Sequence, residues 1–223
     1  MPPESPNARD AGAPSDAIDP RPAPRLYPVF LKLADVPVVI VGGGTVAASK
    51  LDGLLEAGAR VTVIAPSISE AIRARAASPA GSIRLLHRAF SARDLDGARW
   101  VVAAATPDVN REVAAAATVR GLFVNAVDDV AAATAYLGAV VRRGPVELAI
   151  STGGLAPALA GLVREALEAL LPDDVSRWID IAVAARADWK RAGTPIAERR
   201  PLLLRALDHV YSAGARNPAG AAP

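Results

Sequence analysis

A turn of three consecutive glycines, Gly42 to Gly44, follows a β-branched apolar run and precedes a stretch with helical spacing. With Ala47 it fits the pattern G-x-G-x-x-G/A, which joins a strand to a helix in dinucleotide-binding folds. In that pattern Gly42 permits the tight turn, Gly44 lets the backbone approach a pyrophosphate, and Ala47 lets the helix pack closely on the sheet. The first helical N–H groups, at Thr45 and Val46, and the positive end of the helix dipole would face the phosphates. The motif predicts a nicotinamide dinucleotide site; a plain tight turn or a vestigial site is the alternative.

The second predicted strand, Arg60–Ile64, lacks the acidic residue that usually follows it and binds the adenosine ribose. The chain continues instead with Ala65, Pro66 and Ser67. Backbone groups around Pro66 and the hydroxyl of Ser67 are the expected substitutes. No arginine immediately follows the strand to bind a 2′-phosphate. We expect NAD as the cofactor, although this position alone does not decide between NAD and NADP.

Polar residues also follow two later predicted strands. Thr106 comes directly after the apolar run Trp100–Ala105, and Asp128 comes soon after the run Leu122–Asn125. The carboxyl ends of parallel strands meet at one edge of a sheet, where ligands of open α/β folds bind. Thr106 would line the nicotinamide side of the site or cap the next helix, and the sequence favours neither role. From position alone, Asp128 belongs either to a functional site or, together with Asp129, to a simple turn, and we expect Asp129 to be solvated.

The segment Ser151-Thr152-Gly153-Gly154 precedes a predicted helix that begins near Pro157. The N–H groups at a helix start can receive a carboxylate of a ligand. Thr152 can equally serve as an ordinary N-terminal cap. Both roles stay open at this point.

Composition excludes several classes of function. The chain of 223 residues is 52% hydrophobic and only 4% aromatic, and it contains no cysteine, which rules out disulfides and thiolate metal sites. The two histidines are at positions 87 and 209, so we expect no His-rich metal site. No apolar run approaches the roughly 20 residues of a membrane span, and no signal peptide is evident, so we expect a cytoplasmic protein. The formal net charge is +2, and no basic stripe interleaved with aromatic residues indicates nucleic-acid binding.

Strand and helix patterns alternate from Pro37 to Asn125 and predict a Rossmann-type, doubly wound α/β domain with a parallel sheet. Its strands are expected at 38–41, 60–64, 83–86, 100–105 and 122–125, and its helices at 46–57, 69–77 and 110–118. A hairpin follows, with strands at 136–141 and 146–150. Three helices are then expected at 157–171, 174–191 and 195–211.

We therefore divide the chain into five parts. A disordered leader (1–24) precedes the NAD-binding Rossmann domain (25–129), which is followed by a small α+β region (130–156), a C-terminal helical region (157–213) and a disordered tail (214–223). The leader and the tail are rich in small residues and proline and show no hydrophobic periodicity.

A series of short segments lies in order and without large gaps over residues 27–210. The segments are Tyr27–Leu31, Val41–Gly44, Leu54–Ala59, Ala104–Thr106, Val124–Asp128, Ser151–Gly154 with Pro157, Val163–Glu165 and Leu170–Pro172. As a series they are specific, and they resemble the precorrin-2 dehydrogenase family, which includes the first module of bifunctional sirohaem synthases. The chain departs from the family at Gly138, where relatives usually have proline, and at Ser49, where a basic residue is common before Lys50.

The resemblance implies NAD-dependent oxidation of precorrin-2 to sirohydrochlorin, and some members also insert ferrous iron as ferrochelatases. It implies a homodimer built largely by the segments after the Rossmann domain, with residues 130–156 serving dimerisation and substrate contacts. The family's functional aspartate falls on Asp128, which is the implied general base. Arg142, Arg143 and Arg164 are candidates to steer the carboxylates of the tetrapyrrole. The implied tetrapyrrole-binding positions are Asn125, Thr152, Gly153, Gly154 and Arg142.

A different class of function is a dinucleotide-sensing regulatory Rossmann module. Such modules are expected to keep the acid after the second strand and do not need Asp128 or the segment around Thr152. The missing acid and the long helical C-terminal region favour the enzyme. Intact glycines at 42 and 44 argue against a chelatase with a decayed cofactor site.

Overall fold

A computed structural model describes residues 25–78 and 82–215, which fall into two units. Residues 25–31 contain no helix or strand, and every element lies from Lys32 onward. The expected leader (1–24) lies outside the described residues, as does most of the expected tail, of which only 214–215 are described, as the end of the last helix. Within the described ranges, no helix has the length and hydropathy that crossing a membrane requires.

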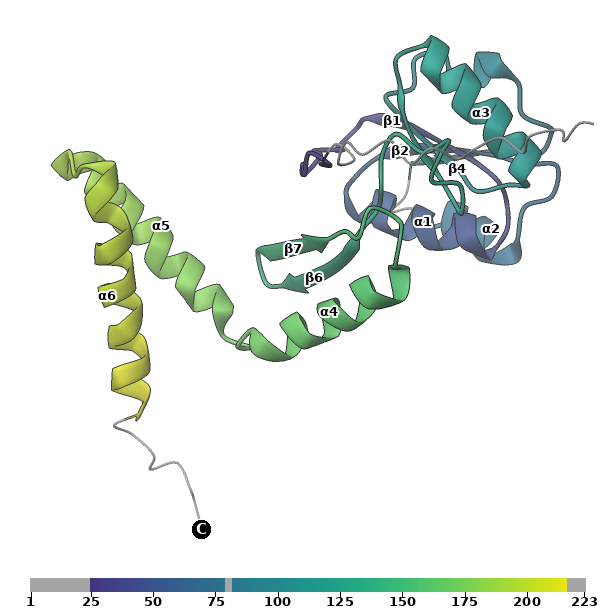
Figure 1. Ribbon diagram of the computed structural model, residues 1–223. Coiled ribbons are helices and arrows are strands. Elements are labelled where there is room, and N and C mark those ends of the chain that lie inside the picture. The colour runs from purple at the N-terminus through teal and green to yellow at the C-terminus, as the bar shows by residue number, and fades with distance from the viewer. Residues whose placement is uncertain (1–24, 79–81, 216–223) are drawn as a thin grey trace, which may run out of the picture. The chain divides into compact units, whose positions relative to one another are not determined.

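Five short parallel strands form one sheet in the order β3-β2-β1-β4-β5. Figure 1 labels three of them, β1, β2 and β4. They are rich in valine, isoleucine, leucine and alanine, as is typical of strands covered on both faces. The order reverses between β1 and β4, which is the point where ligands bind in such sheets. The strands are β1 (Pro37–Val41), β2 (Arg60–Ile64), β3 (Ile83–Leu86), β4 (Trp100–Ala103) and β5 (Phe123–Ala126).

Helices cover both faces of this sheet, so side chains of β1 alternate between two cores. Val38 and Ile40 pack with α1 and α2, whereas Val39 and Val41 pack with α3 and a 3-10 turn, η1. Ala47 is fully buried where α1 meets the sheet, which agrees with the role the glycine motif predicts for it. The helical elements are α1 (Thr45–Glu56), α2 (Glu70–Ala76), η1 (Ala92–Leu95) and α3 (Pro107–Val119).

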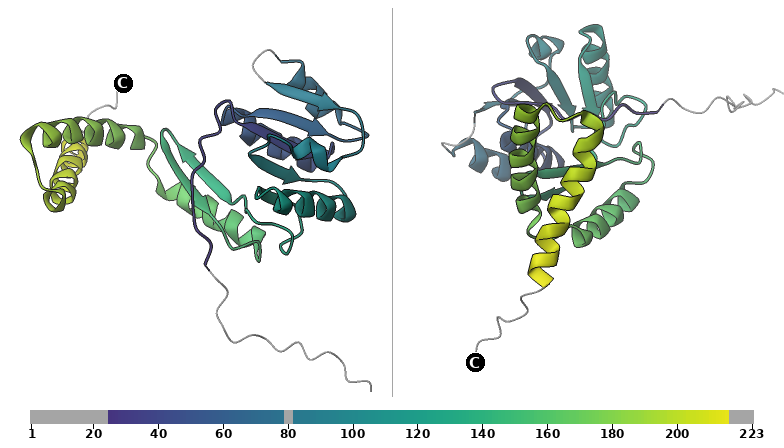
Figure 2. Two further views of the ribbon diagram at one scale, coloured as in Figure 1. Left: turned by 90° about the horizontal axis from the view of Figure 1, so that it is seen from above. Right: turned by 90° about the vertical axis from the view of Figure 1, so that its left-hand side faces the viewer.

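An antiparallel hairpin and three helices follow the parallel sheet. Helix α4 packs along β6, and α5 and α6 pack side by side (Figure 2). Gly144 makes the hairpin turn with a φ of +54°. The elements are β6 (Ala139–Arg143), β7 (Val146–Ile150), α4 (Pro157–Leu170), α5 (Val175–Ala192) and α6 (Ile196–Ala215). A Rossmann-type sheet, a small antiparallel sheet and C-terminal helices confirm the predicted fold class.

The first strand of the hairpin lies slightly later than predicted. It runs from Ala139 to Arg143 rather than from Tyr136 to Val141. The backbone N–H groups of Thr134 and Ala135, just before the predicted start, both donate to the carbonyl of Val124 in β5, at 2.9 and 3.0 Å. The chain is thus still bonded to β5 at Ala135 and enters the hairpin only after it.

Helix α3 begins at Pro107, three residues before its predicted start. Proline is tolerated in the first helical turn, where its missing N–H removes no bond within the helix. The earlier start places Asn110 within the first turns, and its side chain is only 3% exposed. A buried polar residue therefore stands near the carboxyl edge of the sheet.

Two glycines provide a matched test of where the fold requires glycine. A Cβ at Gly42, whose φ is +131°, would lie 2.1 Å from the carbonyl oxygen of Ala104, whereas a Cβ at Gly53 in α1 would meet no other atom within 4 Å. We expect Gly42→Ala to lower the free energy of unfolding by about 2 kcal/mol or more. Gly53→Ala should raise it by about 0.5–1 kcal/mol, because alanine is the better helix former. Urea unfolding followed by circular dichroism measures both changes, and an undiminished stability of Gly42→Ala would contradict the close approach.

Candidate functional site

The glycine turn is wedged between the ends of neighbouring strands. The N–H of Gly42 donates to the carbonyl of Ile64 at the end of β2 (2.9 Å). A Cβ at Gly43 would lie 2.0 Å from the carbonyl oxygen of Ser67, and the Gly43 carbonyl accepts from the N–H of Ser69 (2.8 Å). Packing within the chain therefore requires glycine at the first two positions. The requirement at Gly43 was not part of the motif-based prediction.

Gly44 has no such requirement, since a Cβ there would meet no atom within 4 Å. It is the N-cap residue of α1, and no side chain bonds to the helix start from this position. Thr45 and Val46, the first two helical residues, are exposed. Bare backbone at the start of a helix is a suitable binding place for an anionic group. These residues fit a dinucleotide pyrophosphate as the glycine pattern predicts.

Pro66 and Ser67, expected near the adenosine ribose, are exposed and follow β2 beside the glycine turn. The structure brings them to this edge of the sheet, although neither lines either of the two pockets described below. The first carboxylate after β2 is that of Glu70, and it accepts hydrogen bonds from the guanidinium of Arg73 at 2.7 and 3.0 Å. Both side chains are thus engaged with each other.

A pocket of about 210 Å³ opens beside the start of α1, and we call it the smaller pocket. Thr106 does not line it. Thr106 is the N-cap residue of α3, yet its hydroxyl bonds to no N–H of that helix. Neither of the two predicted roles of the Thr106 side chain is therefore supported by a contact. The walls of the smaller pocket come from α1, the end of β4, α3 and the segment after β5: Val46, Ala104, Ala105, Pro107, Asn110, Val127, Asp128 and Asp129.

Asn110 connects two parts of the smaller pocket and was missed from the sequence. Its Oδ1 accepts from the N–H of Ala105 (2.9 Å), and its Nδ2 donates to the carbonyl of Val127 (3.4 Å). It thereby joins the turn after β4 to the segment after β5. The signal that could have found it is an asparagine at an apolar position of α3, on the same buried face as Val113 and Ala117.

Asp128 stands between the smaller pocket and a second one, and it lines both. Its side chain is exposed, and its backbone has a φ of +58°, in the left-handed region that few non-glycine residues adopt. Neighbouring bonds hold this conformation: the N–H of Val127 donates to Ala103 (2.9 Å), and Asp129 accepts from the N–H of Ala132 (3.0 Å). We expected Asp129 to be solvated, but it is half-buried and closes this turn.

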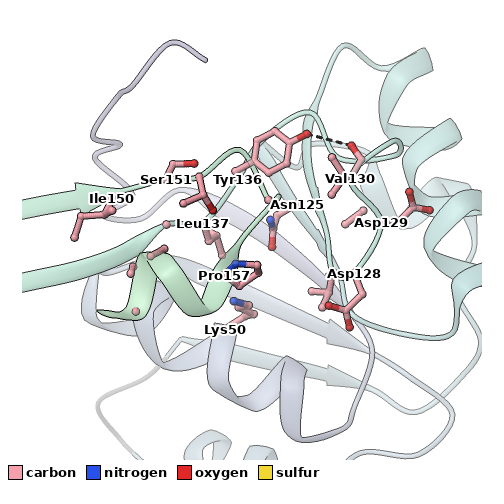
Figure 3. Close-up of a pocket in the computed structure, with 18 residues that line it drawn as sticks. Lys50, Asn125, Asp128, Asp129, Val130, Tyr136, Leu137, Ile150, Ser151 and Pro157 are labelled. Atoms are coloured by element: carbon pink, nitrogen blue, oxygen red, sulfur yellow. Dashed lines mark hydrogen bonds between the residues drawn. The ribbon is translucent and has the colours of Figure 1, made fainter. Parts of the chain in front are cut away.

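The second pocket, which we call the larger pocket, has a volume of about 340 Å³ (Figure 3). It is formed by the end of β5, the segment that leads into the hairpin, the segment after β7 and the first turns of α4, with Lys50 of α1 on the facing wall. Tyr136 is fixed at its rim by a hydrogen bond from its hydroxyl to the carbonyl of Val130 (3.1 Å). The two aspartates after β5 thus line a space bounded by three separate parts of the chain.

Asn125, an implied tetrapyrrole-binding position, lies in the wall of the larger pocket and is 8% exposed. Its Nδ2 donates to the carbonyl of Ala135 (3.0 Å). That carbonyl can only accept, so the amide must present its nitrogen to Ala135 and its oxygen to the other side. The oxygen has no hydrogen-bond partner in the part of the chain that the structure describes. Asn125 therefore offers a buried acceptor beside the pocket.

Thr152 and Gly154 line the larger pocket, and Gly153 does not. The hydroxyl of Thr152 accepts from the N–H of Ala156, the N-cap residue of α4, at 3.2 Å. This bond is local, but it does not make Thr152 the N-terminal cap that we weighed against ligand binding, because the N-cap residue is Ala156 and no side chain bonds to the helix start. Gly154 has a φ of +81°, and a Cβ there would lie 3.0 Å from a methyl group of Val130. Glycine at this position therefore lets the segment after β7 pack closely against Val130.

The structure does not bring the predicted arginines to the larger pocket. Arg142 forms ion pairs with Glu147 (3.1 Å) and Glu56 (3.9 Å), and Arg143 bonds to Asp173 and to the carbonyl of Glu168. The third predicted arginine is likewise paired with carboxylates of its own helix, as Arg164–Glu165 and Arg164–Glu168. Lys50 is instead the basic side chain in the pocket wall.

Comparison with known proteins agrees with these features. A family model for NAD(P)-binding domains matches residues 29–139, and a model described as "Sirohaem biosynthesis protein central" matches residues 143–170. The first match covers the whole parallel sheet, including the glycine turn after β1 and the segment after β5. The second match covers the end of the hairpin and α4. A dinucleotide is thus the class of cofactor that this chain binds.

Curated relatives and a solved structure extend the match. Siroheme synthase 1 of Aeromonas salmonicida (strain A449) is 41% identical over 182 residues, which are 81% of this chain and 38% of that protein. Siroheme synthase of Methylococcus capsulatus (strain ATCC 33009 / NCIMB 11132 / Bath) is 42% identical over 183 residues, again 81% and 38%. The chain therefore spans well under half the length of these relatives. The structure of SirC, precorrin-2 dehydrogenase, superposes with a TM-score of 0.61 and 26% identity, over 81% of this chain and 88% of that one. This chain belongs to the family of precorrin-2 dehydrogenases and of the corresponding modules of sirohaem synthases.

Proposed function

We propose that the chain catalyses the NAD-dependent oxidation of precorrin-2 to sirohydrochlorin. The observation that carries this proposal is the position of Asp128, whose carboxylate borders both the smaller pocket at the glycine turn and the larger pocket. A group in that position can act on a substrate in one pocket while the cofactor occupies the other. The similarity to a precorrin-2 dehydrogenase over most of both chains supports the same reaction.

The dinucleotide, when bound, supplies a hydride acceptor. The backbone at Gly44, Thr45 and Val46 would hold its pyrophosphate, and the smaller pocket would take the nicotinamide half. NAD rather than NADP is favoured because the first arginine after β2, Arg73, already bonds to Glu70 and to the carbonyl of Ile68. A 2′-phosphate would find no unpaired guanidinium at that place.

Asp128 would receive the proton in this oxidation. The two-electron step removes one hydride and one carbon-bound proton from the tetrapyrrole, so a base must stand opposite the hydride acceptor. An exposed carboxylate at the border of two pockets can reach a carbon atom of a substrate in the larger one. Asn110 would keep this base in place, because it ties the residue before Asp128 to the end of β4.

Ferrous iron insertion is a second activity that we propose for the same site. Insertion releases the protons of two pyrrole nitrogens, and Asp128 would accept them from a ring held in the larger pocket. Iron is then a substrate, and the nitrogens of the tetrapyrrole supply its ligands in the product. Within residues 25–78 and 82–215, no three His, Asp or Glu side chains gather into a metal site.

We also propose that residues 25–129 form the dinucleotide-binding part and that the segments after them build a homodimer. Support comes from α4, where three leucines on one helical face, Leu159, Leu162 and Leu170, are 52%, 63% and 76% exposed. A row of large apolar side chains on one face of a helix is typical of a protein interface.

The assay that tests the proposed function is an anaerobic absorbance measurement with precorrin-2, NAD or NADP, and then ferrous ion. We expect the sirohydrochlorin spectrum to appear with NAD, and a further change with iron that is faster than in a control without protein. A protein that binds NAD but leaves precorrin-2 unchanged would contradict the dehydrogenase and would point to a dinucleotide-sensing module instead.

Replacing Gly44 tests the cofactor site. Gly44→Asp should abolish NAD binding, because a carboxylate at this bare position would occupy and repel the pyrophosphate. The fold should persist, since a Cβ at this position meets no atom of the protein within 4 Å. Calorimetric titration with NAD measures the effect, and an unchanged affinity in Gly44→Asp would remove the assignment of this helix start to the pyrophosphate.

Replacing Asp128 tests the base. Asparagine tolerates a left-handed backbone, so Asp128→Asn should keep the local structure while losing the ability to accept a proton. We expect turnover of precorrin-2 to fall by about 100-fold or more, with NAD affinity nearly unchanged. Asp35→Asn is a matched control, because Asp35 is an exposed aspartate with a φ of +60° that lines neither pocket. Retained turnover in Asp128→Asn would exclude the proposed role.

Charges placed on α4 test the dimer. The double variant Leu159→Glu, Leu162→Glu should be a monomer, because two carboxylates cannot be buried unpaired in an apolar interface. Val119→Glu is the control, since Val119 is 85% exposed at the end of α3, in the Rossmann-type domain. Light scattering after size exclusion measures the mass, and a double variant that stays dimeric would place the interface elsewhere.

A further inference from the structure

Lys50 lies in the wall of the larger pocket, and neither the glycine motif nor the family resemblance assigned it a role. It is half-buried on α1, and its ammonium makes no hydrogen bond or ion pair with any residue in the ranges that the structure describes. The other two lysines, Lys32 and Lys190, are exposed. Among the described residues that line the pocket, Lys50 is the sole basic side chain.

A half-buried ammonium without an anionic partner loses hydration and gains no compensating bond, which is unfavourable. The two carboxylates in the same pocket wall do not relieve it, since neither Asp128 nor Asp129 lies within 4.0 Å of the ammonium as an ion pair would. Asp129 is already bonded to the backbone of Ala132. The ammonium is therefore available to an anion that enters the pocket from outside.

Helix α1 connects this anion site to the cofactor site. Lys50 is five residues after Thr45, which corresponds to about 7.5 Å along a helix axis. The start of α1 is fixed by the wedged glycine turn, and Leu51, next to Lys50, is fully buried in the core. One rigid helix thus places an ammonium at a set distance from the bare backbone where the pyrophosphate would bind.

We infer that Lys50 binds a carboxylate on the periphery of the tetrapyrrole and so determines where the ring lies relative to Asp128. This inference rests on the proposed function and adds a specificity-determining residue to it. A carboxylate is the matching ligand group because it is anionic, accepts hydrogen bonds from an ammonium and is abundant on precorrin-2 and sirohydrochlorin. The paired arginines outside the pocket cannot supply the contact without breaking their own ion pairs.

The test is a titration of the full chain with sirohydrochlorin, followed by its absorbance, together with a separate titration with NAD. Lys50→Met keeps the apolar stem of the side chain and removes the charge, and we expect it to weaken sirohydrochlorin binding about tenfold or more. Lys50→Arg should recover most of the affinity, because it restores a cation. The NAD affinity of both variants should stay within about twofold of the unsubstituted chain. Lys190→Met is the matched control, since it removes a lysine that lines neither pocket.

Salt and kinetics separate a charge contact from a purely structural role. Binding by the unsubstituted chain should weaken more steeply with added sodium chloride than binding by Lys50→Met. In turnover, Lys50→Met should raise KM for precorrin-2 with a smaller effect on kcat, as expected for a contact made equally in the ground and transition states.

Three outcomes would overturn the inference. Equal sirohydrochlorin affinity in Lys50→Met and the unsubstituted chain would exclude the contact while leaving the proposed function intact. A parallel loss of NAD affinity would show that Lys50 supports the fold of α1 instead of binding the ring. If the unsubstituted chain itself binds no sirohydrochlorin and does not turn over precorrin-2, the proposed function fails, and this inference fails with it.

Discussion

The close approach of the glycine turn to the ends of β2 and β4 is the constraint on which the rest of the site depends. Two of its glycines leave no room for a Cβ, because the carbonyl oxygens of Ala104 and Ser67 would lie 2.1 and 2.0 Å away. This packing fixes the direction in which α1 leaves the sheet. The helix in turn carries the bare backbone at its start, at Gly44, and the side chain of Lys50 further along. A close contact between backbone atoms therefore sets the positions of the proposed pyrophosphate site and of the proposed carboxylate site.

The opposite wall of the site depends on a polar contact instead. Asn110 bonds to the turn after β4 and to the segment after β5, so these two ends cannot move independently. Fixed ends on both sides let Asp128 keep a left-handed backbone that is costly for a residue with a Cβ. The chain turns at Asp128 as it leaves β5, and in this position Asp128 lines both the smaller and the larger pocket.

Local patterns in the sequence were sufficient for the parallel sheet. The bounds of β2 and β3 agree with the prediction, because short, mainly apolar runs between turn residues have few alternative structures. Both bounds of β6 were predicted too early, since the bonds of Thr134 and Ala135 to Val124 keep the chain beside β5, and no local pattern reveals them. The same limit explains the site: the glycine turn has a local signature, whereas Lys50 and Asn110 gain their positions only when distant segments meet. The arginines were chosen for their charge, and only the fold shows that nearby carboxylates already pair with them.

Charge balance explains why single contacts matter in the larger pocket. Its described wall holds two aspartates and one lysine, so the pocket does not attract a ligand with many carboxylates by its net charge. The whole chain adds little, with a formal net charge of +2. Affinity for such a ligand must then come from apolar burial of the ring and from individual polar groups such as the ammonium of Lys50 and the unpartnered oxygen of Asn125. A wall with this balance would also disfavour a carboxylate of the proposed substrate beside Asp128, because like charges repel. The ring, rather than its acidic side chains, would then be the part of that substrate that approaches the proposed base.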